Sequence, residues 1–137
     1  MNYEQYAYPI FRDVIPRLEY ASKLADAEAV AEELEVVLKM LKPYSGNPAW
    51  WYPTLETDFD YIKSVMRKLV EDVRMVAQLP KDSYEYWQRM NSTRETIMLL
   101  AKNLRSAATC YYWPVILMGI LITATIFVIL VIVIHLL

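Results

Sequence analysis

The stretch VILMGILITATIFVILVIVI, residues 115–134, has no charged side chain, and its only polar groups are Thr123 and Thr125. At about 1.5 Å per residue it forms a helix of about 30 Å, the thickness of the hydrocarbon core of a bilayer. Fifteen of its residues are Leu, Ile, Val or Phe, and together they contribute about −5 to −9 kcal/mol to insertion. A buried helix of a soluble protein normally keeps a polar face, which this stretch lacks. The stretch therefore predicts a transmembrane helix.

The sequence around this span predicts a tail-anchored topology. Only residues 135–137 follow the span, and the first residues, MNYEQYAYPIFRD, have neither the basic start nor the hydrophobic run of a signal sequence. Arg94, Lys102 and Arg105 precede the span and no Lys or Arg follows it, as the positive-inside rule requires of a cytoplasmic N-terminal region. We expect a single-pass membrane protein whose N-terminal domain is cytoplasmic.

An aromatic belt is expected just before the span, in CYYWP, residues 110–114. Tyr111, Tyr112 and Trp113 are of the types that favour the headgroup region, where an apolar ring body and a polar tip are both accommodated. We therefore treat residues 110–137 as an interfacial belt followed by the transmembrane helix. Cys110 is the only cysteine, and it is either an unmodified interfacial residue or a site of reversible acylation.

Hydrophobic spacing predicts a second long helix over residues 54–79. Apolar residues recur there at intervals of four and three, the heptad spacing of a coiled coil. Thr54 is a candidate cap, and Pro80 supplies the stop. The stripe consists of Leu55, Phe59, Ile62, Met66, Leu69, Val73 and Val76.

Two further helices are predicted by the same spacing. One covers residues 16–42, between Pro16 and Pro43, and the other covers residues 83–109 after Pro80. The second has a capping-box pattern at Ser92 and Glu95 that allows a new helix to start there, so its continuity stays open.

These three helices predict an all-α, antiparallel three-helix bundle over residues 16–109. The last helix must run toward the membrane, so residues 54–79 run away from it. Both helices are about 40 Å long, so Thr54 and Thr109 should lie at nearly the same height above the membrane.

That geometry places the loop NPAWWYP, residues 47–53, beside the aromatic belt. We expect Trp50, Trp51 and Tyr52 to form a second membrane-interface site. Two alternatives are that the tryptophans pack in the core of the bundle or contact a partner subunit.

The N-terminal arm, residues 1–15, is expected at the end of the bundle remote from the membrane. Tyr3, Tyr6 and Tyr8 suit a partner contact, because tyrosine buries much area at little cost in side-chain entropy. The alternative is a short helix folded back over the bundle.

Two other positions are candidates for partner contacts. The stripe of residues 83–109 places Arg94 between Met90 and Ile97, so its charge must either reach the edge of the bundle or form a buried ion pair, within this chain or with another subunit. In the span, Gly119 and Thr123 have the small-xxx-small spacing of closely packed transmembrane helices.

The composition gives no support for catalysis. The single histidine, His135, lies beyond the span, and two glycines cannot make a glycine-rich phosphate loop. A net charge of −2 without a basic cluster disfavours nucleic acid. We expect no enzyme activity, no cofactor, no metal and no small-molecule substrate. The bilayer is one expected partner, and other membrane subunits or a cytoplasmic protein are the rest. The first hypothesis is an accessory or structural subunit of a membrane protein complex; the alternatives are an adaptor that recruits a soluble partner and a self-associating virion protein.

Overall fold

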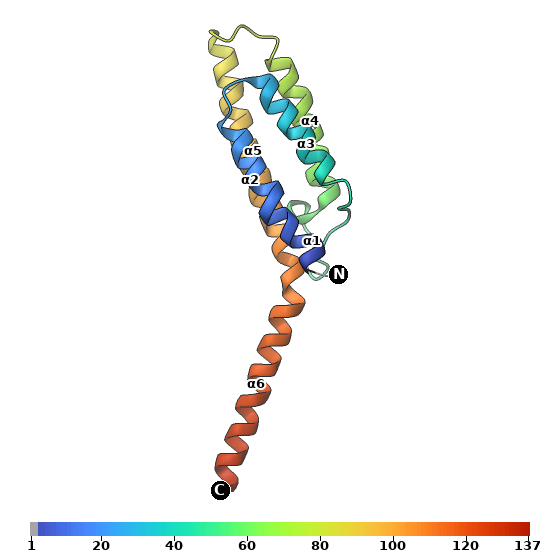
Figure 1. Cartoon of the computed structure of the whole chain (residues 1–137), viewed down its shortest axis with the longest axis vertical. Helices are drawn as coiled ribbons and strands as arrows, with labels where there is room; N and C mark the ends of the chain where they lie inside the picture. Colours follow the sequence, from blue (N-terminus) through green and yellow to red (C-terminus); the bar gives the residue numbers. More distant parts are fainter. Residues whose placement is uncertain (1–2) are drawn as a thin grey trace.

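The computed structural model describes residues 3–137, except the side chains of residues 3, 4 and 113. Within this part of the chain the secondary structure is helical, with no strand. Figure 1 shows a bundle of helices at one end of a long, isolated C-terminal helix, α6 (Trp113–Leu136). The all-helical class and the separate apolar helix agree with the sequence prediction.

The N-terminal arm is helical and is continuous with the helix expected to follow it. α1 (Tyr3–Pro9) leads through a π-helical turn, η1 (Ile10–Val14), into α2 (Ile15–Lys23). Pro16 cannot donate a hydrogen bond to the carbonyl four residues before it, and the wider π turn ends just before this position. The predicted helix start at Pro16 is therefore wrong, because the chain is already helical when it reaches that residue.

The expected single helix over residues 16–42 is also wrong, because the chain turns back at residues 24–26. Leu24 and Asp26 have extended backbones with ψ of 139° and 122°. A new helix, α3 (Ala27–Met40), begins there, with the Asp26 carboxylate accepting a hydrogen bond from the Ala29 N–H. The apolar spacing runs on across this turn because both helices bury residues against the same core.

The α3–α4 connection ends in a short 3₁₀ turn, η2 (Leu55–Thr57), followed by α4 (Phe59–Val76). The cap of α4 is Asp58, whose Oδ1 accepts from the N–H groups of Asp60 and Tyr61 at 2.9 and 3.1 Å. The predicted start at Thr54 is thus too early, and Leu55 is exposed. The remaining six stripe residues of this helix, from Phe59 to Val76, are buried.

α5 (Tyr84–Thr109) is one uninterrupted helix capped by Ser83, so no new helix starts at Ser92. A 3₁₀ turn, η3 (Cys110–Tyr112), joins it directly to α6. The buried face of α5 begins at Tyr86, and it passes through Thr93 rather than Arg94.

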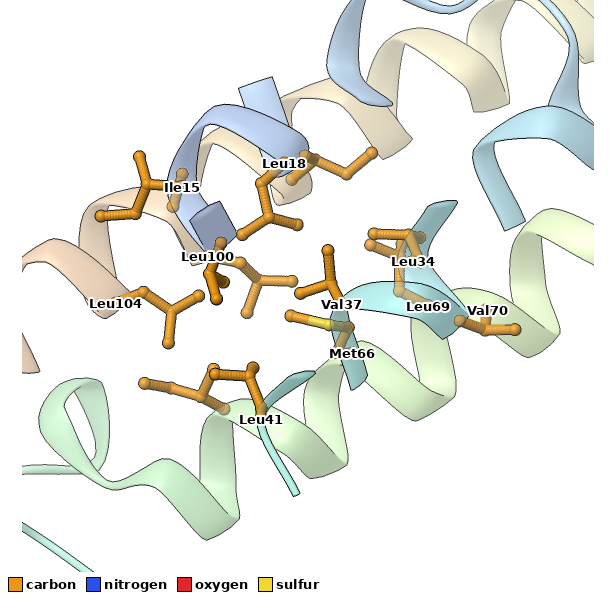
Figure 2. Close-up of a cluster of buried hydrophobic side chains, with 14 of the residues drawn as sticks. Ile15, Leu18, Leu34, Val37, Leu41, Met66, Leu69, Val70, Leu100 and Leu104 are labelled. Atoms are coloured by element: carbon orange, nitrogen blue, oxygen red, sulfur yellow. The ribbon is translucent and has the colours of Figure 1, made fainter. Parts of the chain in front are cut away.

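Within residues 3–112 the bundle has four packed helical segments rather than three. They are α1 to α2, α3, α4 and α5. α2 packs on α3 and α5, and α4 packs on α3 and α5, so each helix packs on the next in the chain and α2 also packs on α5. Figure 2 shows apolar side chains from all four helical segments meeting in one core. The labelled residues are Ile15, Leu18, Leu34, Val37, Leu41, Met66, Leu69, Val70, Leu100 and Leu104.

The additional helical segment places the N-terminus at the opposite end of the bundle from the one predicted. Because residues 24–26 make a hairpin, α1 lies beside the end of α5 from which α6 emerges (Figure 1). The prediction that the arm lies at the opposite end of the bundle is therefore wrong, and the alternative of a helix folded on the bundle describes it better.

Candidate membrane interface

The loop that carries Trp50 and Trp51 lies beside the first two turns of α6. Both indoles line an apolar groove of 550 Å³ together with residues of α6. The rings meet edge to face with centroids 5.6 Å apart. Trp50 is 77% exposed and Tyr52 is 75% exposed, and Trp51 is also exposed, so these rings do not pack in the core of the bundle. The α6 residues that line the groove are Pro114, Leu117, Met118 and Leu121.

Asn47 holds this loop in a fixed turn. Its side-chain amide donates to the Thr54 carbonyl at 2.8 Å, and its Oδ1 accepts from the Ala49 N–H at 3.0 Å. The same oxygen accepts from the Thr57 hydroxyl at 2.9 Å. These hydrogen bonds connect Asn47 to residues within and just after the segment that carries the tryptophans, so they hold the backbone beneath the exposed rings in place.

Gly46 and Asp60 attach the beginning of the loop to α4. Gly46 has a φ of +69°, a left-handed conformation that glycine adopts without the steric penalty of a β-carbon. Its N–H donates to Asp60 Oδ2 at 3.1 Å, and its carbonyl accepts from the Phe59 N–H at 3.0 Å. The loop therefore leaves the bundle in a direction fixed by the first turn of α4.

Lys63 is a second tie between α4 and the loop. Only 8% of this residue is exposed, and its ammonium donates to the Tyr44 carbonyl at 2.5 Å. Asp60 Oδ1 lies 3.8 Å from the same nitrogen. A buried lysine is tolerated only with such partners, because an unpaired buried charge costs several kcal/mol.

An aromatic cluster closes the end of the bundle above the span. The Tyr111 ring is 6.0 Å from that of Tyr6 and 6.3 Å from that of Phe59. Tyr44 contacts both Tyr6 and Phe59, and its hydroxyl donates to the Tyr6 carbonyl at 2.6 Å. Tyr6 is thus an internal packing residue of the bundle. Sequence reasoning missed this cluster, although the helical spacing of Ala7, Ile10 and Val14 could have indicated it.

The hydroxyl of Tyr111 supplies a pH-dependent contribution to stability. Burial, with smaller effects from Tyr44 and Tyr6, raises the pKa of Tyr111 to about 12. An unfolded tyrosine ionises near a pKa of about 10, so between pH 10 and 12 the unfolded chain releases a proton that the folded bundle keeps. This contribution is full below pH 10 and is lost as the pH rises through 12. We expect the free energy of unfolding, measured by urea titration in detergent, to fall more steeply above pH 10 for the native chain than for Tyr111→Phe. Equal slopes for the two proteins would contradict this assignment.

The other predicted aromatic contacts are distributed as follows. Tyr112 contacts Phe11 with ring centroids 6.0 Å apart. Tyr8 is exposed, and the Arg12 guanidinium lies 5.0 Å from its ring centre. The side chains of Tyr3 and Trp113 lie outside the described residues.

Among the described side chains of this chain, Arg94 has no acidic partner and so forms no buried ion pair within the bundle. Its side chain is half-buried at the edge of the bundle, and Nη1 donates to Asn91 Oδ1 at 2.9 Å. Thr93 takes the core position instead and satisfies its hydroxyl on the Arg89 carbonyl at 2.9 Å. The spacing was misjudged by one residue at this turn.

The polar groups of α6 are satisfied within the helix. The Thr123 hydroxyl donates to the Gly119 carbonyl and the Thr125 hydroxyl to the Leu121 carbonyl, both at 2.8 Å. His135 Nδ1 lies 3.0 Å from the Val131 carbonyl oxygen. The threonines therefore do not need a partner for their hydroxyl groups.

Cys110 is buried at the junction of α5 and α6. Its thiol donates to the Ser106 carbonyl with Sγ 3.2 Å from the oxygen, and burial raises the pKa of the Cys110 thiol. A raised thiol pKa lowers the fraction of reactive thiolate at neutral pH.

Comparison with family models, curated proteins and solved structures gives no match for this chain. Among the described residues, no three His, Cys, Asp or Glu side chains are grouped so that they could hold a metal ion. The proposals below therefore start from the geometry at the junction of the bundle and α6.

Proposed function

We propose that this chain is a non-enzymatic, single-pass membrane protein that serves as an accessory or structural subunit of a larger membrane protein complex. In this proposal α6 is the anchor, and the bundle stands on the cytoplasmic surface of the membrane. The Trp50 and Trp51 loop is a second contact with the interfacial region.

The observation that carries the proposal is the complete exposure of an apolar helix. Pro114–Leu136 is long and apolar enough to cross a membrane, and none of it is buried against the bundle. Exposed apolar surface costs about 25 cal/mol per Å², and soluble monomers rarely expose a patch of this extent. A bilayer removes that cost.

The distribution of charge supports a cytoplasmic bundle. Lys102 and Arg105 lie on the last two turns of α5, just before the span. Positive residues close to a span favour the cytoplasmic side.

Two opposite faces of α6 support the subunit assignment. At 100° per residue, the side that carries Leu117 and Leu121 toward the tryptophan loop is roughly opposite the side that carries Gly119 and Thr123. The Gly119 side has a shallow apolar groove of 630 Å³, and a β-carbon added at Gly119 would meet nothing within 4 Å. A second transmembrane helix could approach closely there, held by packing rather than by hydrogen bonds.

The proposal can be tested with two matched threonine variants. Thr123 and Thr125 make the same bond to the carbonyl four residues before, but they differ by about 200° around α6. We expect the full chain, purified in mild detergent from its native membrane, to retain other membrane proteins. Thr123→Leu should weaken that association, and Thr125→Leu should not. A native chain that is monomeric and retains no other protein would contradict the subunit assignment.

An adaptor that recruits a soluble partner is the second candidate. Tyr84 is 80% exposed and Trp87 is also exposed, and both lie at the end of the bundle remote from α6. Exposed aromatic residues are enriched at protein interfaces. Loss of a bound soluble protein on Tyr84→Ala and Trp87→Ala, with membrane partners unchanged, would favour the adaptor over the subunit.

The second membrane contact predicts a difference among the tryptophans. In full-length chains that keep one tryptophan and replace the others by phenylalanine, we expect Trp50 and Trp51 to be strongly quenched by lipids brominated near the headgroup. Trp87, also exposed but at the far end of the bundle, should respond to aqueous acrylamide instead. Trp50 fluorescence that behaves like that of Trp87 would show that the loop stands clear of the bilayer.

A further inference from the structure

Four cationic side chains surround one small pocket between the end of α3 and the beginning of α4. The pocket has a volume of 240 Å³ and is lined by Leu38, Lys39, Lys42, Lys63 and Arg67. Lys39 lies in the last turn of α3 and Lys42 just after that helix, and the other two cations are one turn apart on α4. The pairing of these two helices, which lie side by side in Figure 1, therefore gathers charges that the sequence keeps 20 or more residues apart.

The positive charge of this pocket is largely uncompensated. Lys39, Lys42 and Arg67 form no ion pair with any side chain that the structure describes, whereas Arg17 and Arg74 on the neighbouring surface pair with Glu33 and Glu35. An anion would therefore find three unengaged cations on one concave surface.

Lys63 gives the pocket a fixed floor. Its ammonium uses one of three N–H donors on the Tyr44 carbonyl, and Asp60 is its acidic neighbour at 3.8 Å. The side chain is buried, so its nitrogen has no freedom to swing into solvent. The carboxylate of Asp60 is shared with the Gly46 N–H, which reduces its capacity to neutralise the lysine.

The pocket lies close to the membrane-facing end of the bundle. Phe59 contacts Tyr111, three residues before the span, so these residues share one height. Lys63 is four residues farther along α4 and Arg67 eight, about 6 and 12 Å above that level. Extended lysine and arginine side chains at this height are within about a Debye length, 8–10 Å, of the headgroup region of a bilayer.

We propose that this pocket binds the phosphate-bearing headgroup of an anionic phospholipid. Arg67 suits two parallel hydrogen bonds to phosphate oxygens, and the lysines add compact positive charge around it. A lipid is favoured over a soluble anion because Lys63 and Arg67 lie only about 6 and 12 Å along α4 from the level of Phe59 and Tyr111, next to the start of α6. The inference rests on the proposed membrane location and adds a lipid class to it.

The test compares two triple variants of the full chain with the same change in charge. The pocket variant carries Lys39→Gln, Lys42→Gln and Arg67→Gln, and so lacks the three cations that form no ion pair. The control variant carries Lys23→Gln, Lys68→Gln and Lys102→Gln. These changes remove three exposed cations that do not line the pocket. All six positions are exposed, so both proteins should keep the helical circular dichroism of the native chain.

Lipid binding is read by native mass spectrometry in mild detergent with phosphatidylglycerol or phosphatidylcholine. We expect the native chain and the control variant to prefer phosphatidylglycerol, and the pocket variant to lose at least about tenfold of that preference. Equal losses in the two variants would show diffuse electrostatic attraction and overturn the site. Displacement of the lipid by an equal concentration of inorganic phosphate would show a soluble-anion site and overturn the lipid assignment.

Flotation with phosphatidylcholine vesicles separates the two proposals. Every variant keeps α6, so all should float if the membrane proposal is correct. A native chain that fails to float would contradict the proposed function itself. A chain that floats without any preference for phosphatidylglycerol would contradict only the headgroup site.

Discussion

Replacement of Tyr86 by alanine should lower the free energy of unfolding by about 3–5 kcal/mol, the range for removal of a large buried aromatic side chain. Only 1% of Tyr86 is exposed, and it lies among the largest buried side chains. Its hydroxyl accepts from the Ala27 N–H at 3.0 Å and donates to the Ala25 carbonyl at 3.1 Å. The residue therefore fills the core and also fastens the turn that separates α2 from α3.

Tyr86→Phe isolates the role of the hydroxyl. This change keeps the ring but leaves the first N–H of α3 and the Ala25 carbonyl without their partner, at a cost of about 1–3 kcal/mol. Tyr84→Ala is the control, because Tyr84 is exposed on the same helical turn and its loss should change stability by no more than about 0.5 kcal/mol. Urea unfolding of the full chain in detergent, followed by circular dichroism, measures all three. A Tyr86→Phe protein as stable as the native one would contradict the fastening role.

Two arginines in the middle of α6 should abolish stable membrane insertion. Ile122→Arg together with Ile126→Arg changes the insertion free energy by about 6–8 kcal/mol, which offsets nearly all of the −5 to −9 kcal/mol from the apolar residues. Both isoleucines are more than half exposed, and neither lines the groove beside the Trp50 and Trp51 loop. Resistance to alkaline carbonate extraction of membranes from expressing cells is the measurement.

The control for this variant places the same two charges at the end of the helix. Arginines at Leu136 and Leu137 can extend their side chains to the aqueous surface, so they should leave most of the protein in the membrane pellet. If the Ile122 and Ile126 variant stays in the pellet as well as the native chain, α6 is not the element that anchors the protein.

The elements predicted most accurately from the sequence were those bounded by strong local signals. The apolar helix needs only length and composition, and residues 84–109 contain no glycine or proline, although the Ser92 and Glu95 pattern left the continuity of α5 open. The end of α3 near Pro43 and the buried stripe of α4 after Phe59 follow from proline placement and spacing. These signals come from residues within one helical segment, so they can be recognised in a single sequence without knowledge of how the helices pack.

The hairpin at residues 24–26 was missed because its signal is weak and its cause is distant. Asp26 is a competent cap, but no glycine or proline marks the turn, and apolar spacing continues through it. What fixes the turn is the hydroxyl of Tyr86, 59 residues beyond Ala27. Because the hairpin was missed, the N-terminal arm was placed at the wrong end of the bundle and three helical segments were predicted instead of four.

The position of the Trp50 and Trp51 loop beside the start of α6 was predicted, but the bonds that hold the loop were not. Helix lengths and one change of direction were enough to place Trp50 and Trp51 level with the start of the span. The ties made by Asn47 and Lys63, and the gathering of Lys39, Lys42 and Arg67, depend on how α3 and α4 pair. No spacing within one helix encodes that pairing.

The helix that begins at Tyr84 runs through η3 into α6 without a loop, so a tilt of α6 in a bilayer would also tilt α5. A transmembrane helix is tilted by about 20° on average from the bilayer normal. The far end of the bundle stands about 40 Å above the span, so such a tilt carries Tyr84 sideways by roughly 14 Å. In the proposed membrane location, the tilt of α6 therefore sets the lateral position of the exposed rings of Tyr84 and Trp87.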